Sequence, residues 1–226
     1  MPALKIVHFS DILCVWAYVG QTSLDRLFAR FGDRLAVETR FCSVFPDAHG
    51  KIEAMWRDRG GFAGYAAHVR EVVVGFPDAA IHDDAWSVTR PTSSASPHLF
   101  VKALEMLGRA AEDAPFQDRL SVRAAKEMRS AFFAEGRDIS DWAEQRRIAG
   151  RLGVDFDEIR AKIESGEGIA RLAADYELGR SQLVRGSTTY ILNEGRQILL
   201  GNISYGILEA NVAELLSEPR DLSASV

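Results

Sequence analysis

Two cysteines are the residues of this chain best suited to covalent chemistry. Cys14 lies in the segment HFSDILCVWAYVG, residues 8–20, between a short apolar run and an aromatic segment typical of a helix start. The positive end of a helix dipole and the free backbone N–H groups there favour a thiolate. We therefore predict that Cys14 is the catalytic nucleophile, that its thiolate is stabilised, and that it is the more reactive thiol.

The second cysteine, Cys42, lies in RFCSVF near the end of a predicted strand. Parallel strands bring their carboxyl ends to one edge of a sheet, so Cys42 is a candidate auxiliary thiol that resolves adducts on Cys14. The interpretation we favour is packing into the core, with Cys42 buried and not disulfide-bonded to Cys14. No C-x-x-C or H-x-x-x-H spacing accompanies the cysteines, so no metal site is predicted.

The elements that would position Cys14 form a βαβ unit. Residues 4–9 are an apolar run suited to a buried strand, and residues 35–45 predict a second strand. Between them, Leu24, Leu27 and further apolar residues recur at helical spacing up to Gly32, which predicts the end of the helix. Strands joined in this way are parallel, with a right-handed crossover.

The rest of the chain divides into a helical block and a second α/β segment. Residues 50–165 show helical patterns, with Ser140 as one predicted helix start and Asp155 with Glu158 as a capping box. A further helix follows, and then the runs TTYIL and QILLG flank NEGR, which predicts a hairpin. Ser204 can cap a last helix.

The order β-α-β, helices, α-β-β-α predicts an α/β, thioredoxin-like fold with a helical insertion between its two halves. We assign residues 1–49 and 166–226 to the thioredoxin-like domain and residues 50–165 to the insertion subdomain.

Composition limits the partners. The net charge of −5 and the pI of about 5.6 argue against a nucleic-acid or anionic-membrane surface. No apolar run approaches the length of a membrane span, and the N-terminus lacks the pattern of a secretory signal. We expect a cytoplasmic protein without nucleic-acid or membrane partners, and a homodimer remains open.

The segment SDILCVWAYVG resembles the active site of the DsbA family, in particular its FrnE-like branch, where the pattern is S-D-x-x-C-P-W-C-Y-x-G. Six positions match: Ser10, Asp11, Cys14, Trp16, Tyr18 and Gly20. Val15 stands in place of the proline and Ala17 in place of the second cysteine. The resemblance covers nearly the whole chain and implies a thioredoxin-fold oxidoreductase or isomerase.

Other segments carry the same resemblance. LVRGSTTYIL, residues 183–192, is similar to the loop that holds the family's cis-proline, with Thr188 at the proline position. SSASPH is similar to a family segment that ends in histidine, here His98. The resemblance implies that Trp16, Ser187 and Thr188 shape the substrate groove beside Cys14. His98 either lines the same groove or is a hydrogen-bonded histidine at a helix start.

The departures from the family pattern have chemical consequences. Ala17 cannot resolve a mixed disulfide, so only a single-cysteine mechanism with an outside thiol is consistent with this motif. A cis bond before a residue other than proline costs about 2.5–4 kcal/mol, which predicts a trans Ser187–Thr188 peptide. Asp11 is interpreted as a turn residue whose charge opposes thiolate formation, and His8 as a buried core residue.

Three functions are therefore considered. The first is glutathione- or thiol-linked disulfide exchange through Cys14, with no bound cofactor, glutathione as a candidate co-substrate, and a small thiol or protein disulfide as substrate. The second is an enzyme similar to kappa-class glutathione transferases and 2-hydroxychromene-2-carboxylate isomerases, although those carry serine at the active position and this chain has GNIS, residues 201–204, after its hairpin. The third is a non-catalytic binding or redox-sensing module.

Overall fold

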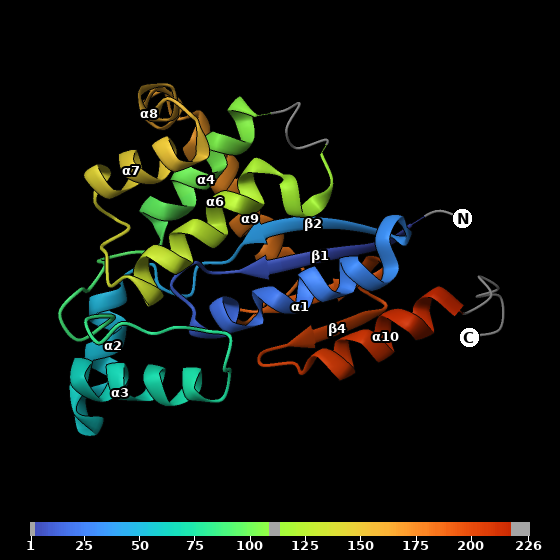
Figure 1. Cartoon of the computed structure of the whole chain (residues 1–226), viewed down its shortest axis with the longest axis horizontal. Coiled ribbons are helices and arrows are strands. Elements are labelled where there is room, and N and C mark those ends of the chain that lie inside the picture. Colours follow the sequence, from blue (N-terminus) through green and yellow to red (C-terminus); the bar gives the residue numbers. More distant parts are fainter. Residues whose placement is uncertain (1–2, 109–113, 218–226) are drawn as a thin grey trace.

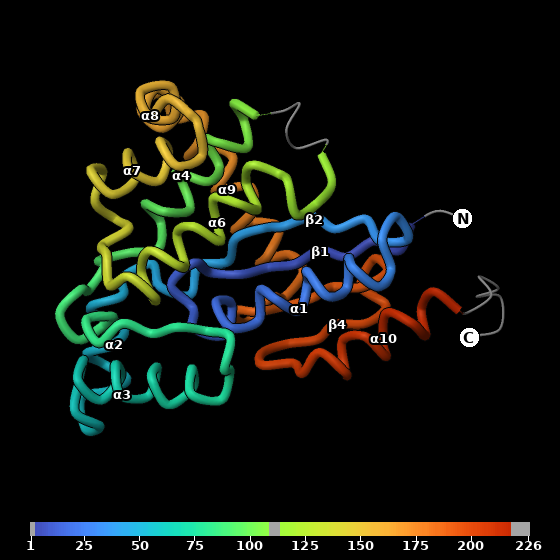
Figure 2. The backbone as a smooth tube through the Cα atoms, in the orientation of Figure 1, coloured from blue at the N-terminus to red at the C-terminus, as the bar shows by residue number. Residues whose placement is uncertain are grey.

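The computed structural model describes residues 3–108 and 114–217, and a mixed four-stranded sheet lies at its centre. In spatial order the strands are β2 (Leu35–Phe41), β1 (Leu4–Ser10), β3 (Thr189–Leu192) and β4 (Gln197–Leu200). β1 and β2 are parallel, whereas β3 is antiparallel to both β1 and β4. Figure 2 shows the blue N-terminal strands beside the orange C-terminal hairpin. The thioredoxin-like α/β fold is confirmed.

Helices cover both faces of this sheet, because the strands at its centre are apolar on both sides. Ile6 packs in one cluster with residues of α1 (Val15–Phe31) and α10 (Tyr205–Ser217). Phe9, one of the alternate residues of β1, packs on the other face with residues of α9 (Glu167–Ser181). Figure 1 shows α1 and α10 in front of the sheet and α9 behind it. Alternate side chains of β1 therefore point to opposite faces of the sheet, one covered by α1 and α10 and the other by α9.

The remaining helices form a block beside the carboxyl ends of β1 and β2. They are α2 (Ala48–Trp56), α3 (Gly61–Val74), α4 (Ala95–Leu107), α6 (Leu120–Arg129), α7 (Trp142–Leu152) and α8 (Phe156–Glu164). Fully buried rings fill the centre of this block, among them Trp86, Phe100 and Phe132. The start of α1 packs in the same cluster, so the block encloses the segment that carries Cys14. The division into domains at residues 50 and 165 stays a prediction.

Most helix ends lie where the local sequence signals place them. Gly32 follows the last residue of α1 with a φ of 52°, and Asp155 caps α8 by accepting a hydrogen bond from the N–H of Asp157 at 2.9 Å. The prediction that Ser140 begins a helix is wrong. The N-cap of α7 is Asp141, whose side chain accepts from the N–H of Ala143 at 2.8 Å. A carboxylate directly before the first helical residue reaches this donor, whereas Ser140 lies one residue too early.

A buried carboxylate ties α9 to β2 and α4. Asp175 is fully buried and accepts hydrogen bonds from Arg40 Nη1 at 2.8 Å and from the N–H of Phe41 at 3.0 Å. The oxygen that accepts from Phe41, Oδ2, also lies 2.8 Å from Lys102 Nζ. These contacts fix the end of β2 and therefore the position of Cys42, the residue that follows it.

Candidate thiol site

Cys14 lies between β1 and α1, at the N-cap position of the helix. Its carbonyl oxygen accepts from the N–H groups of Ala17 and Tyr18, both at 3.1 Å, and its own N–H donates to the carbonyl of Asp11 at 3.2 Å. The thiol donates to the carbonyl oxygen of Ser187 at 3.4 Å. The predicted position at the first turn of the helix is confirmed, and the 183–188 loop lies against the thiol.

The loop opposite Cys14 is held from both sides. Ser187 Oγ accepts a hydrogen bond from the N–H of Asp11 at 2.9 Å, and Thr188 exchanges two hydrogen bonds with Gly201, at 2.8 and 3.0 Å. The Ser187–Thr188 peptide is cis, so the prediction of a trans bond is wrong. That prediction considered only the bond itself, whereas the loop makes long-range hydrogen bonds on both sides of it.

Burial determines the protonation of Cys14. The residue is 6% exposed, and burial raises the pKa of its thiol. Hydrogen bonds from the Ser187 side chain and from the N–H groups of Ala17 and Trp16 act in the opposite direction but do not reverse the shift. The predicted stabilisation of the thiolate by the helix start is present, but the loss of hydration has the larger effect, so the pKa of Cys14 lies above its ordinary value.

Cys42 lies beside the 183–188 loop as well, next to Gly186 rather than Ser187. Its N–H donates to the carbonyl of Ser10 at 3.0 Å, and its thiol faces the carbonyl oxygen of Gly186 at 3.8 Å. It is 8% exposed, and burial raises its pKa, with further upward contributions from Asp11 and Cys14. Both cysteines are free thiols. The expectation of a buried Cys42 without a disulfide to Cys14 is confirmed, and its role as an auxiliary thiol stays a prediction.

Asp11 holds the segments around the two cysteines together. The residue is fully buried. One carboxylate oxygen accepts from the N–H of Leu13 at 2.9 Å. The other accepts from the N–H groups of Val44 and Phe45 at 2.9 and 3.1 Å and from Ser94 Oγ at 2.8 Å. Asp11 is therefore more than the turn residue that the sequence suggested, because it joins the start of α1, the chain after β2 and the start of α4.

His98 is fully buried and belongs to the same network, so the structure does not place it on a groove surface. Its Nε2 accepts from the N–H of Ile12 at 3.1 Å, and its Nδ1 lies 3.0 Å from the hydroxyl of Tyr176. Burial lowers the pKa of His98 to about 4, so the ring is neutral at pH 7. A neutral ring that accepts at Nε2 carries its proton on Nδ1 and donates it to Tyr176.

The other expected site residues lie nearby with different degrees of contact. Trp16 is partly buried and meets Phe76 edge-on, with ring centroids 6.4 Å apart. Thr188 is 4% exposed, and its hydroxyl donates to the carbonyl of Gly201. The carbonyl of Ser187 accepts the hydrogen bond of the Cys14 thiol, and the N–H of Trp16 is directed at the same sulfur.

Two further residues near the thiols come from the helical block. Lys51 of α2 donates to the carbonyl of Val44 at 2.7 Å. Burial lowers the pKa of Lys51, while the charges of Asp11, Cys14 and Cys42 raise it, so its ammonium group lies within electrostatic reach of both thiols. Burial likewise raises the pKa of Tyr65, with an upward contribution from Cys14. Neither residue was predicted, because a distant helix brings each of them to the site without a recognisable spacing.

Comparison with known proteins agrees with the thioredoxin-like fold. Residues 103–213 match the family model of the DSBA-like thioredoxin domain. The fold of the chain is that of DSBA-like thioredoxin-domain proteins. A comparison with curated proteins finds no match. No helix in the described ranges is long and apolar enough to cross a bilayer.

Solved structures share the fold of this chain at low sequence identity. A Streptomyces coelicolor protein described as a probable DsbA oxidoreductase superposes with a TM-score of 0.75 at 17% identity, over 97% of this chain and 92% of its own. The cytosolic disulfide reductase DsbM of Pseudomonas aeruginosa gives 0.66 at 22% identity, over 94% and 97%. A 2-hydroxychromene-2-carboxylate isomerase gives 0.61 at 13% identity, over 93% and 95%.

Proposed function

We propose that this protein carries out thiol–disulfide exchange with glutathione through Cys14 alone. The observation that carries the proposal is the position of Cys14 at the N-cap of α1, with its thiol against the Ser187 carbonyl and with the alanine Ala17 in the following turn. A DSBA-like thioredoxin fold supports the choice of reaction. The setting we propose is the cytoplasm, where glutathione keeps thiols reduced.

The exchange has two steps, and an outside thiol completes it. The Cys14 thiolate attacks the glutathione sulfur of a glutathione mixed disulfide, and the substrate sulfur leaves as a thiolate that takes up a proton. Cys14 then carries glutathione in a new disulfide. The thiolate of a free glutathione attacks the glutathione sulfur of this bond, which releases the Cys14 thiolate and oxidised glutathione. The net reaction frees the substrate thiol and consumes one free glutathione, which pairs with the glutathione that the substrate carried.

The surroundings of Cys14 imply a slow reaction at neutral pH. The raised pKa leaves less thiolate than the few per cent that a free cysteine has at pH 7. Loss of the thiol proton also removes the hydrogen bond to the Ser187 carbonyl and leaves two electron-rich atoms 3.4 Å apart. Attack therefore requires deprotonation against both burial and this carbonyl, and its rate rises with pH.

Lys51 is the cation that we assign to substrate binding. Glutathione carries carboxylates, and an ammonium group within electrostatic reach of Cys14 attracts them. Lys51 is partly exposed on α2, so its charge is accessible from solvent. The assignment predicts a weaker reaction with oxidised glutathione in Lys51→Gln and an unchanged reaction with an uncharged disulfide.

The test is a mixed disulfide on one named cysteine. The whole protein is incubated with oxidised glutathione over a range of pH, and intact mass and peptide mapping identify the adduct. We expect one glutathionyl group on Cys14, no adduct in Cys14→Ser, and an unchanged adduct in Cys42→Ser. An adduct that needs Cys42, or an intramolecular disulfide that forms after the first attack, contradicts the single-cysteine mechanism.

The burial of Cys14 supports a second candidate, a non-catalytic thioredoxin-fold binding module. A thiol that is 6% exposed with a raised pKa is also what a retired redox site would show. In that case the folded protein gives no adduct up to pH 9, while both cysteines react after unfolding in urea. Glutathione binding without turnover then identifies the module.

A further inference from the structure

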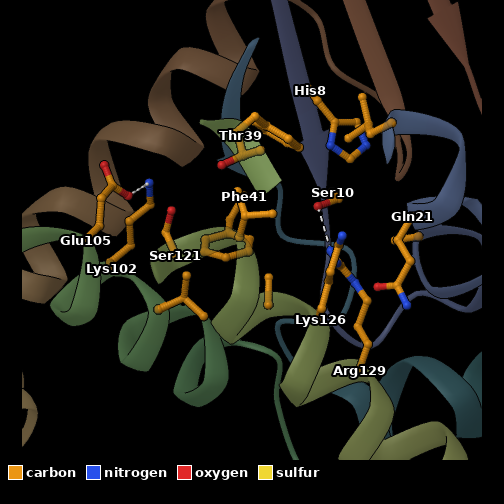
Figure 3. A pocket seen from close by; sticks show the side chains of 16 residues that line it. His8, Ser10, Gln21, Thr39, Phe41, Lys102, Glu105, Ser121, Lys126 and Arg129 are labelled. Atoms are coloured by element: carbon orange, nitrogen blue, oxygen red, sulfur yellow. Dashed lines mark hydrogen bonds and ion pairs between the residues drawn. The ribbon is translucent and has the colours of Figure 1, made fainter. Parts of the chain in front are cut away.

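A second feature is a cavity on the α1 side of the sheet, whose lining includes neither cysteine. Its volume is about 40 Å³, and β1, β2, α1, α4 and α6 contribute its lining. Figure 3 shows Arg129 and Lys126 rising from α6 toward Ser10 and Gln21, with His8 above them. Among the described residues, the function proposed above leaves these side chains unused.

Three polar atoms that line this cavity have no hydrogen-bond partner within the described structure. They are Arg129 Nε, His8 Nε2 and Gln21 Oε1. Arg129 is 5% exposed and His8 is 6% exposed. Buried polar atoms are nearly always paired, so three unpaired ones around one cavity indicate that a ligand or water belongs there.

Charge distinguishes these two occupants. Arg129 Nη2 donates to the neutral hydroxyl of Ser10 at 2.9 Å, and no carboxylate in the described ranges lies at ion-pair distance from this guanidinium. The other cations of the lining are paired: Lys126 with Asp25 at 2.7 Å, and Lys102 with Asp175 at 2.8 Å. Arg129 is therefore a buried positive charge on which Asp11 acts only at longer range, without a carboxylate at ion-pair distance among the residues described, and this is costly in a protein interior.

We propose that the cavity binds one small monovalent anion, a chloride ion or the carboxylate of a one- or two-carbon acid, with Arg129 as its counter-ion. Such an anion accepts from Arg129 Nε–H and neutralises the guanidinium, which water alone does not do. A water molecule occupies roughly 10–15 Å³ of a cavity measured in this way, so a volume of about 40 Å³ accommodates an anion of a few heavy atoms.

The neighbours of Arg129 favour a single negative charge. Burial lowers the pKa of His8 to about 3, so the ring is neutral at pH 7 and its Nε2 can donate a proton without adding a second positive charge. The Gln21 amide presents a donor to the same space when its oxygen and nitrogen are exchanged, an orientation set by hydrogen bonding. A divalent anion would leave one charge uncompensated.

The test is an anion titration of the whole protein. Thermal unfolding is followed in sodium chloride, sodium formate and sodium gluconate at matched ionic strength, because gluconate is too large for the cavity. We expect the Tm to rise with the logarithm of the anion concentration, by roughly 5–10 °C at one hundred times the Kd, with chloride, formate or both, and not with gluconate. Comparison of the first two salts distinguishes a halide site from a carboxylate site. Equal effects of all three salts overturn the proposal.

Variants and a direct measurement complete the test. We expect Arg129→Gln to remove the rise of Tm with anion concentration. Arg123→Gln, at an exposed position on the same helix, should retain it. If Arg129→Gln does not fold, the wild-type protein is crystallised with sodium bromide. An anomalous peak within hydrogen-bond distance of the Arg129 guanidinium supports the site. A cavity that holds only water in bromide and in formate overturns it.

Discussion

Asp11 offers a demanding test of how the thiol site is held together. Its carboxylate accepts four hydrogen bonds, from Leu13, Val44, Phe45 and Ser94, all at 2.8–3.1 Å and all in a fully buried position. Three of the donors are backbone N–H groups, which have no freedom to turn toward another acceptor. The serine hydroxyl has an alternative in the carbonyl of Phe45, at 3.2 Å.

The magnitude of the loss follows from these partners. Asp11→Ala leaves three buried N–H groups unpaired, and each such group costs about 1–3 kcal/mol. Relief from burying the charge of Asp11, together with water entering the space, offsets part of this loss. We expect a decrease of about 3–5 kcal/mol in the free energy of unfolding, which is a Tm lowered by roughly 10 °C. Asp11→Asn keeps an oxygen for Val44 and Phe45 and loses the acceptor for Leu13, so we expect about 1–3 kcal/mol.

Urea unfolding at pH 7, followed by circular dichroism and tryptophan fluorescence, measures these differences. Asp33→Asn is the matched control, because this aspartate is exposed on the turn after α1. We expect its effect to stay within about 0.5 kcal/mol. If Asp11→Ala is too unstable to purify, the comparison rests on Asp11→Asn. A loss below about 1 kcal/mol for Asp11→Ala would refute the view that this carboxylate joins the three segments.

Three further predictions concern pH and charge. His98 has a pKa of about 4 in the folded protein against 6.5 when unfolded, so the stability it contributes is full above pH 6.5 and is lost as the pH falls toward 4. His98→Gln should reduce the slope of unfolding free energy against pH by about 1.4 kcal/mol per unit within that window. Alkylation of Cys14 by iodoacetamide should accelerate about tenfold per pH unit up to pH 9, because its pKa is raised, and mass spectrometry of Cys42→Ser isolates this rate. Asp175→Ala should lower the unfolding free energy by about 3–5 kcal/mol in urea, since it removes the buried partner of Lys102 and leaves the partly exposed Glu105.

Each of these predictions has an outcome that contradicts it. An unchanged slope in His98→Gln would mean that the ring is not held neutral by burial. A rate of Cys14 alkylation that levels off below pH 8 would mean that the helix start dominates after all. If Asp175→Ala has near-normal stability, and adding Lys102→Met to it changes nothing, the buried pair of Lys102 and Asp175 contributes little to stability.

The elements of the fold could be predicted because their signals are local. The apolar run before Cys14 and the helical spacing that ends at Gly32 identify β1 and α1 without knowledge of the rest of the chain. The hairpin was placed by two short apolar runs around NEGR, and the strands Thr189–Leu192 and Gln197–Leu200 lie there. Helix starts were less certain, since neighbouring polar residues such as Ser140 and Asp141 both qualify as caps.

The network around Asp11 could not be predicted in this way. Its partners Val44 and Ser94 lie 33 and 83 residues further along the chain, and neither stands at a spacing that identifies it. His98 was singled out by type, but the sequence gives no sign that its ring accepts from Ile12 and donates to Tyr176. Such roles depend on which segments meet in the folded chain, and one sequence does not reveal this.

Cys14 shows why a local argument about reactivity needs the magnitude of burial. A helix start favours a negative charge by typically 0.3–1 kcal/mol, and by about 2 kcal/mol in favourable buried geometries. Full burial raises the pKa of an acid by up to 3–5 units, which corresponds to about 4–7 kcal/mol. The sequence showed the helix donors, and Trp16 and Ala17 do provide them, but it did not show the helical block that encloses the thiol. Where a cysteine caps a helix inside such a block, burial determines its protonation and the helix sets only how far the shift is reduced.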